Sequence, residues 1–268
     1  MKRTAGIILA ALAAVLCVAT SCGKKESGIK IIAHRGLWTA PEAKNAQNSI
    51  KTFQLAQEHE IWGSEFDVQM TKDCFLVVNH DGDINGKSIH DNNYEDIKDE
   101  LLSNGEKLAT LSQYLEQGKK SKTVMELEIK GAGSPERDSI ATMLTLQALK
   151  DHKVFDPKRV EFQAFSFQVR KLLARYAPGF SCLYLEGDLS PEEIQKEGLN
   201  GIAYSKHVFM NHPEWVQDAK ARGIKTDVWT INEPDDMRYF VEAGLDQIES
   251  DYPLVLREVL GELEEKAK

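Results

Sequence analysis

The chain has 268 residues, of which 42% are hydrophobic and 28% are charged, and its formal net charge is −9. That length allows one large domain or two small ones with a substantial core. The acidic balance argues against a nucleic-acid partner, for which a basic surface is typical.

The first residues have the layout of an export signal. A basic start at Lys2 and Arg3 precedes an apolar stretch over residues 6–18 and then a run of small residues. The apolar stretch is short for a membrane-spanning helix, which needs about 20 apolar residues. We therefore assign residues 1–22 to an export signal and exclude them from the fold.

The signal ends in Ala19-Thr20-Ser21-Cys22, which resembles a bacterial lipobox, although leucine is more usual than alanine at its first position. In a lipobox the cysteine is lipidated and becomes the new N-terminus. We expect the protein to be exported and to lie in the periplasm or at the cell surface. The lipid on Cys22 would be its only attachment to a membrane. Residues 23–28 then form a short tether. The alternative is simple cleavage near Ser21 and free secretion.

Two further cysteines, Cys74 and Cys182, belong to the remaining chain. They are too few for a disulfide framework and lack the partner spacing of a zinc site. We expect both to be small buried residues.

Between about residue 29 and the C-terminus, short apolar runs alternate with longer amphipathic stretches. Strands separated by helices pair in parallel through crossover connections. The expected strands cover residues 29–33, 61–70 with 75–81, 123–130, 160–166, 180–186, 201–205, 224–232 and 246–251. The expected helices cover residues 49–60, 108–120, 134–152, 167–177, 190–198, 211–223, 233–244 and 252–268.

Local signals mark the ends of several of these helices. Ser134, Ser190 and Asn232 are residue types that cap helices, and each is followed within two residues by a proline suited to a first helical turn. Gly223 and Gly244 stand where helices are expected to stop.

About eight strand–helix repeats in some 240 residues match the size of a single (β/α)8 barrel of the α/β class, here residues 29–268. A doubly wound open sheet would show the same alternation. Polar residues cluster after several different strands, which favours the barrel, because an open sheet uses one crevice. The polar segment 82–108 is expected to be a small insertion after the second strand region.

The stretch Gly63-Ser64-Glu65-Phe66-Asp67-Val68 places two carboxylates on one strand face. Residues two apart point the same way, so Glu65 and Asp67 share the inward face while Trp62, Phe66 and Val68 turn towards helices. Buried carboxylates need a cation. That cation could be Mg²⁺ or Ca²⁺, which prefer oxygen ligands, or the side chain of an Arg or Lys in a core salt bridge. These two residues alone favour neither interpretation.

The same alternation recurs in residues 124–130, where Glu126, Glu128 and Lys130 face inward. Glu128 is expected level with the mouth of the barrel, and Glu126 one layer lower in a structural salt bridge. A third inward carboxylate favours the metal interpretation.

Two of the seven histidines, His34 and His80, follow strand-like runs. Facing a divalent cation, two imidazoles suit an acid and a base on either side of a breaking bond. Arg35 and Lys130 add positive charge suited to a phosphate group. Together these residues indicate phosphoryl transfer from a diester.

These residues resemble the signature of the glycerophosphodiester phosphodiesterase family over nearly the whole chain after the signal. The matching fragments, in the family's order, are His34-Arg35-Gly36, Glu65-Phe66-Asp67, His80-Asp81, Thr110-Leu111, Glu128-Ile129-Lys130, Ser166-Phe167, Trp229-Thr230-Ile231-Asn232 and Asp251-Tyr252-Pro253.

The resemblance implies a metal-dependent (β/α)8 barrel that cleaves glycerophosphodiesters to glycerol 3-phosphate and an alcohol. It implies one Mg²⁺ or Ca²⁺ and an attacking oxygen from water or from the neighbouring glycerol hydroxyl. The implied roles are metal ligation by Glu65, Asp67 and Glu128, acid/base catalysis by His34 and His80, phosphate binding by Arg35 and Lys130, and contact with the glycerol by Trp229.

One departure from the family pattern is Gln47-Asn48-Ser49, where Glu-Asn-Thr is common. Two other functions compete with the leading one: a barrel phospholipase acting on intact lipid headgroups, and a lipoprotein that binds such ligands without cleaving them. A degenerate binder should have lost one of the histidines or carboxylates, and none is lost. We expect a monomer or a simple homo-oligomer.

Overall fold

The computed structural model describes residues 28–266. The predicted export signal, Cys22 and the tether up to residue 27 lie outside the described residues. Among residues 28–266, no helix combines the length and the apolar character that a membrane crossing needs.

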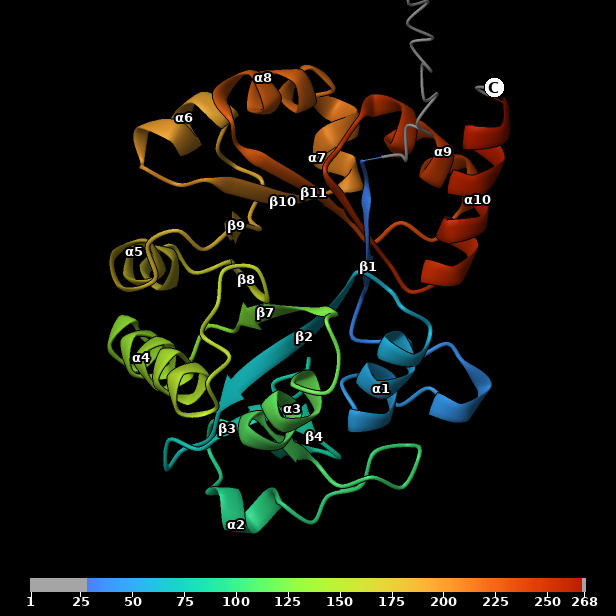
Figure 1. Cartoon of the computed structure of the whole chain (residues 1–268). Helices are drawn as coiled ribbons and strands as arrows, with labels where there is room; N and C mark the ends of the chain where they lie inside the picture. The colour runs from blue at the N-terminus through green and yellow to red at the C-terminus, as the bar shows by residue number, and fades with distance from the viewer. Residues whose placement is uncertain (1–27, 267–268) are drawn as a thin grey trace, which may run out of the picture.

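Eight parallel strands form a closed barrel, because β1 pairs with β12 on one side and with β2 on the other (Figure 1). The predicted (β/α)8 barrel is therefore confirmed over the open sheet. In barrel order the strands are β1 (Lys30–Ala33), β12 (Gln247–Ser250), β11 (Lys225–Trp229), β10 (Gly201–Ser205), β9 (Cys182–Tyr184), β8 (Val160–Ala164), β7 (Val124–Ile129) and β2 (Gly63–Met70).

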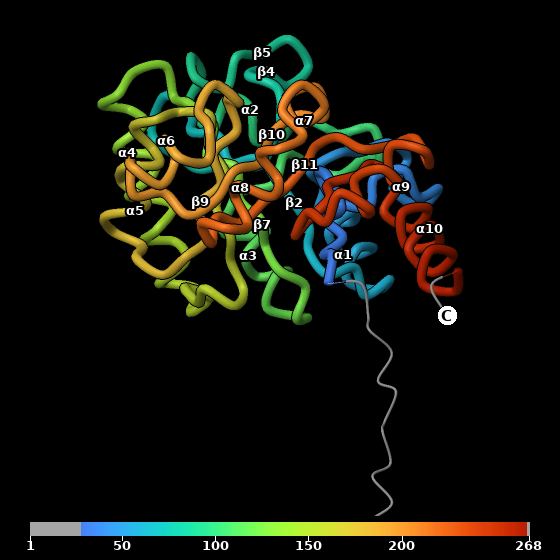
Figure 2. Tube along the Cα trace, turned by 90° about the horizontal axis from the view of Figure 1, so that it is seen from above, coloured from blue at the N-terminus to red at the C-terminus, as the bar shows by residue number. Residues whose placement is uncertain are grey.

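Helices surround the barrel (Figures 1 and 2). They are α1 (Ile50–Glu58), α3 (Leu111–Gly118), α4 (Pro135–Asp151), α5 (Phe167–Tyr176), α6 (Pro191–Lys196), α7 (Lys206–Asn211), α8 (Glu214–Arg222), α9 (Pro234–Ala243) and α10 (Pro253–Lys266), with the 3₁₀ turn η1 (Pro41–Ala43) before α1. Helix α10 contacts β1, so the first described residues lie beside the C-terminal helix (Figure 2).

The predicted helix ends are confirmed except at one position. Ser134 and Ser190 cap α4 and α6 through their side-chain oxygens, and Gly223 and Gly244 end α8 and α9 with positive φ. Asn232 was expected to cap α9, but that cap is Glu233. Asn232 instead donates to Asp251 at 2.7 Å, a contact that secondary-structure signals cannot reveal.

An insertion follows β2, as expected. The chain turns back as β3 (Leu76–Val78), antiparallel to β2, and β6 (Ala109–Thr110) pairs with β3. Between them lie the hairpin β4 (Asp83–Ile84) and β5 (Lys87–Ser88) and the short helix α2 (Tyr94–Ile97). A small apolar cluster of its own holds the insertion together: Val77, Ile84, Ile89, Ile97 and Leu108.

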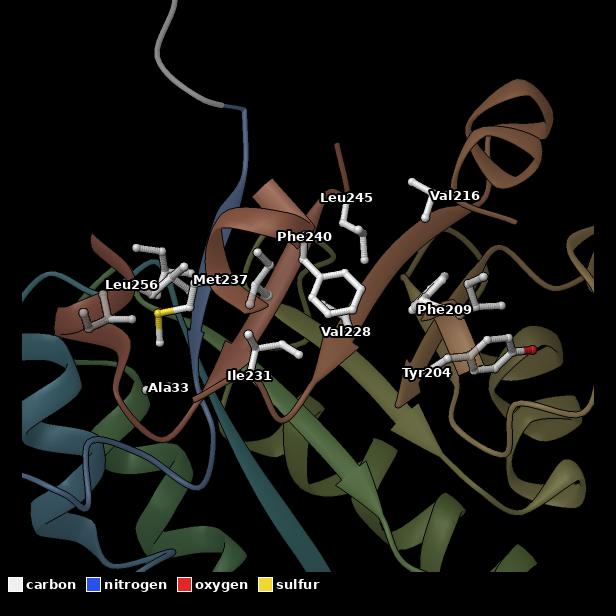
Figure 3. Packing of buried hydrophobic residues seen from close by; sticks show 14 of the residues in the cluster. Ala33, Tyr204, Phe209, Val216, Val228, Ile231, Met237, Phe240, Leu245 and Leu256 are labelled. Atoms are coloured by element: carbon white, nitrogen blue, oxygen red, sulfur yellow. The ribbon is translucent and has the colours of Figure 1, made fainter. Parts of the chain in front are cut away.

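The main core lies between the barrel and its helices. In Figure 3, Phe240 and Met237 of α9 lie among Val228 of β11 and Ile231. On the other side of the barrel, the Phe66 ring lies 4.4 Å from the Tyr114 ring, centroid to centroid. Burying a large apolar side chain stabilises the fold by about 1.5–3 kcal/mol.

The barrel strands alternate as predicted, with apolar side chains towards the helices and polar ones towards the interior. Phe66, Val68 and Leu127 belong to the helix-facing core. Trp62 differs: it precedes β2 and is half-buried, with its ring 5.8 Å from Lys30 Nζ. Cys182 is buried as expected, whereas Cys74 is only half-buried, and both are free thiols.

Candidate active site

The predicted site residues meet at the carboxyl ends of the barrel strands. A cavity of about 70 Å³ is lined by seven of the eight barrel residues singled out from the sequence: His34, Arg35, Glu65, His80, Glu128, Lys130 and Trp229. The eighth, Asp67, is 1% exposed and lies beneath Lys130, whose Nζ is 2.8 Å from Asp67 Oδ1.

His34 follows β1 and is held by a carboxylate from the far end of the chain. Its Nδ1 lies 2.8 Å from Oδ1 of Asp251, which follows β12, the neighbour of β1. Since a carboxylate accepts hydrogen bonds, Nδ1 carries the proton and Nε2 is left for proton exchange. Burial opposes ionisation of Asp251, but hydrogen bonds from His34, Asn232 and Trp38 outweigh it and lower its pKa.

Arg35 has a left-handed backbone, with φ of 55°. This turn directs its backbone N–H to Glu65 Oε2 at 2.8 Å. Its Nη1 donates to Gln47 Oε1 at 2.7 Å. Gln47, the departure from the family pattern, therefore positions the Arg35 guanidinium.

Gly36 continues the turn with φ of 78°. A Cβ atom there would lie 2.5 Å from Thr52 Oγ1, so the close approach of the turn to α1 requires glycine.

Asp67 is the most heavily bonded carboxylate of the site. It accepts from Asn48 Nδ2 at 2.8 Å, and its own N–H donates to Asn48 Oδ1 at 3.2 Å. Lys130 Nζ reaches both Asp67 Oδ1 at 2.8 Å and Glu128 Oε2 at 2.7 Å. Burial opposes ionisation of Asp67, but Lys130 outweighs it and lowers the pKa of Asp67.

His80 reaches the mouth from outside the barrel. Because β3 runs antiparallel to β2, Asn79 donates its backbone N–H to the Asp67 carbonyl, and His80 is the next residue. The Gln69 amide donates to the carbonyls of His80 and Asp81 at 3.0 and 2.7 Å, which fixes this turn. Partial burial lowers the pKa of His80, which favours its neutral form at pH 7.

Glu65, Asp67 and Glu128 form a group that fits a divalent cation. Each offers an oxygen within 4.8 Å of the other two, and all three are buried. Burial raises the pKa of Glu65 well above its usual value, and burial together with Asp67 raises that of Glu128 to about 7. Three buried carboxylates beside one lysine need further positive charge, and an all-oxygen donor set suits a hard cation.

The opposite wall of the cavity is apolar. Trp229 is anchored by its Nε1, which donates to the Ala203 carbonyl at 2.7 Å. Phe165 meets it edge to face, with ring centroids 6.1 Å apart, and Leu185 lies beside them. One side of the cavity is therefore charged and the other can contact carbon.

Sequence reasoning missed two residues of the site and was wrong about the contact of a third. Asp251 was only a family landmark, and Glu249, which lines the cavity, was not singled out. The alternation Gln247–Glu249 on β12, with polar residues on the inward face, was the available signal. The salt bridge expected at Glu126 is wrong: among the described residues no cationic nitrogen lies within salt-bridge distance, and Gln163 donates to it at 2.7 Å instead.

Known proteins are similar to this chain in sequence and in fold. Residues 34–255 match the sequence profile of the Glycerophosphoryl diester phosphodiesterase family. A glycerophosphodiester phosphodiesterase from Caldanaerobacter subterraneus subsp. tengcongensis is 32% identical over 243 residues, covering 84% of this chain and 95% of the relative.

Solved structures of related proteins have the same fold. A glycerophosphodiester phosphodiesterase from Parabacteroides distasonis superposes with a TM-score of 0.85 at 40% identity, covering 90% of this chain and 99% of that one. An Oleispira antarctica phosphodiesterase, solved with the product sn-glycerol-3-phosphate, shares the fold with a TM-score of 0.75 at 21% identity, covering 87% and 96% of the two chains. The chain belongs to the glycerophosphoryl diester phosphodiesterase family and is an enzyme of that class.

Proposed function

We propose that this enzyme hydrolyses glycerophosphodiesters to glycerol 3-phosphate and an alcohol, with His34 and His80 as the acid/base pair. The observation that carries the proposal is the single cavity in which both histidines, Arg35 and Lys130 face a group of carboxylates. Water adds across one P–O bond, so that the phosphate keeps the glycerol and the alcohol leaves with a proton.

The phosphate group would lie between the cationic side chains and the histidines. Arg35 is fixed by Gln47, and Lys130 is fixed by Asp67 and Glu128, so neither needs to be ordered when an anion binds. Asp251 holds the His34 ring in one orientation. His80, favoured in its neutral form, can accept a proton.

We propose Glu65, Asp67 and Glu128 as the ligands of one Mg²⁺ or Ca²⁺. Such an ion supplies Lewis-acid stabilisation of the charge that develops on phosphate oxygens. The ligand carboxylates are preorganised by Lys130, by Asn48 and by the Arg35 backbone. Trp229 and Phe165 offer the carbon skeleton of glycerol an apolar wall.

We further propose that lipidated Cys22 tethers the protein to a membrane after export. The first described strand begins at Lys30, at the amino end of the barrel, whereas the cavity opens at the carboxyl ends of the strands. The tether of residues 23–28 is six residues long and reaches at most about 22 Å. The mouth would therefore open away from the attachment point, which favours soluble glycerophosphodiesters over lipids of the same membrane. Labelling of the wild type, but not of Cys22→Ala, with a radioactive fatty acid tests the anchor.

The test of the activity is release of glycerol 3-phosphate from glycerophosphocholine by the purified protein. Release should require Mg²⁺ or Ca²⁺ and stop when a chelator is added. His34→Ala and His80→Ala should each abolish it, whereas His59→Ala, an exposed histidine at the end of α1, should not. Activity that survives either of the first two substitutions would refute the acid/base assignment. Faster cleavage of intact phospholipid than of its deacylated form would establish the phospholipase alternative.

A further inference from the structure

A second group of buried carboxylates lies deeper in the barrel. Glu126 of β7, Asp227 of β11 and Glu249 of β12 each place an oxygen within 4.8 Å of the other two. Glu126 and Asp227 are fully buried, and Glu249 is 2% exposed. Because Glu126 precedes Glu128 by two strand residues, this group lies roughly 7 Å below the mouth along β7. We call these three residues the deep carboxylates.

The deep carboxylates have few hydrogen-bond donors. Within residues 28–266, Oε2 of Glu126 and both carboxylate oxygens of Asp227 have no hydrogen bond of good geometry, and Asp227 has only the Val228 backbone N–H and the Glu249 carboxyl close to it. The amide oxygen of Gln247 is also without a donor, and Gln247 is the register partner of Asp227 on the neighbouring strand. A buried oxygen without a partner is costly, whether it is charged or neutral. A cation can satisfy oxygens of both kinds.

A side-chain amide links two of the deep carboxylates. Gln163 Nε2 donates to Glu126 Oε1 at 2.7 Å and also to Glu249 Oε1. This amide bridges two carboxylates from β7 and β12, which are not neighbouring strands. It uses one oxygen of each, which leaves Glu126 Oε2 and both oxygens of Asp227 for another ligand.

The barrel interior holds more carboxylates than cationic side chains. Seven buried carboxylates on barrel strands are paired with only three cationic side chains among the described residues. The carboxylates are Glu65, Asp67, Glu126, Glu128, Glu161, Asp227 and Glu249, and the cations are Arg35, Lys130 and Lys225. Carboxylates therefore outnumber the cations that the protein itself supplies in the barrel interior.

We propose that Glu126, Asp227 and Glu249 bind a second divalent cation, of the hard, oxygen-preferring class of Mn²⁺ and Mg²⁺. Its role is structural, because it joins β7 to β11 and β12 across the barrel interior. It also fixes Glu249, whose carboxylate lies within 4.8 Å of Glu65 and His34. The proposal does not depend on the phosphodiesterase mechanism.

The test is to count and locate Mn²⁺ in the purified protein. After chelator treatment, equilibrium dialysis against Mn²⁺ should give two ions per wild-type chain. Asp227→Asn and Glu126→Gln should each reduce the ratio to one. Glu161→Gln is the matched control, because Lys225 and Gln247 already pair with that buried carboxylate, and it should keep two ions.

Anomalous diffraction from Mn²⁺-soaked wild-type crystals locates the ions even if a variant does not fold. A peak among the deep carboxylates supports the proposal. One ion per wild-type chain, or two ions with no peak at this position, overturns it, because protons or water would then satisfy the group. A deep peak without a peak at Glu65, Asp67 and Glu128 would count against the proposed catalytic metal and leave this inference standing.

Discussion

Replacing Asp251 by asparagine should slow catalysis through His34 without weakening substrate binding. Asp251 Oδ1 accepts from Trp38 Nε1 at 2.9 Å and lies 2.8 Å from His34 Nδ1, while Oδ2 accepts from Asn232 Nδ2 at 2.7 Å. An asparagine side chain has one oxygen and one NH₂ group, so one of these donors must face another donor. Asn232 cannot turn its amide without cost, since its oxygen accepts from the Asp251 backbone N–H at 3.0 Å.

The magnitude follows from the kind of hydrogen bond that is lost. A hydrogen bond to a charged group contributes about 1.5–3 kcal/mol. If that contribution supports His34 in the transition state, kcat should fall by about 10- to 150-fold. Asp251 does not line the cavity, so KM for glycerophosphocholine should stay within about twofold.

The assay is steady-state release of glycerol 3-phosphate, with thermal unfolding followed in parallel. Asp235→Asn is the control, because that carboxylate is 99% exposed and pairs only at the surface with Arg238. A kcat for Asp251→Asn within twofold of the wild type would show that His34 needs no orienting carboxylate. A rise in KM with unchanged kcat would equally refute the reasoning, since it would place Asp251 in binding.

Three further predictions concern Glu128, Asn48 and Phe165. Burial and Asp67 raise the pKa of Glu128 from 4.5 to about 7. The protonated carboxyl therefore stabilises the metal-free fold, which should lose up to about 3 kcal/mol of unfolding free energy as pH rises from about 4.5 to 7. Urea unfolding in the presence of chelator measures this loss, and excess Mg²⁺ should abolish the dependence of unfolding free energy on pH. Asn48→Ala should lower the free energy of unfolding by about 2–4 kcal/mol in the same assay, because Asp67 loses two hydrogen bonds and alanine is strained at φ of 57°. Asn48→Gly loses the same hydrogen bonds without the strain, so its loss should be about 1 kcal/mol smaller. Phe165→Ala should raise KM about 2- to 10-fold with little change in kcat, because the edge-to-face partner of Trp229 is lost from the cavity wall.

Most of the fold could be predicted because its signals are local. Alternation on β2 and β7 separates polar from apolar faces residue by residue, and prolines and glycines mark the helix ends. The failure at Asn232 has a physical reason: a capping residue type looks the same in sequence whether it caps a helix or bonds a distant carboxylate. Only the pairing of β11 with β12 brings Asn232 to Asp251.

The site was predictable where chemistry and strand position coincide, as at Glu65, Asp67 and Glu128. Contacts that depend on the closure of the barrel were not. His34 and Asp251 are separated by 217 positions and meet because β1 and β12 are neighbours. The antiparallel return of β3, which delivers His80, is likewise a tertiary feature that the apolar run alone does not reveal.

The departure at Gln47 can now be interpreted by its contact. Its amide oxygen accepts from Arg35 Nη1 at 2.7 Å. A glutamate there would still accept from Arg35, but it would neutralise the guanidinium that we assign to the phosphate. Glutamine orients Arg35 and leaves its positive charge for the substrate. The exchange therefore changes the charge on the phosphate side of the cavity, while Glu65, Asp67 and Glu128, which we propose as the metal ligands, are all present.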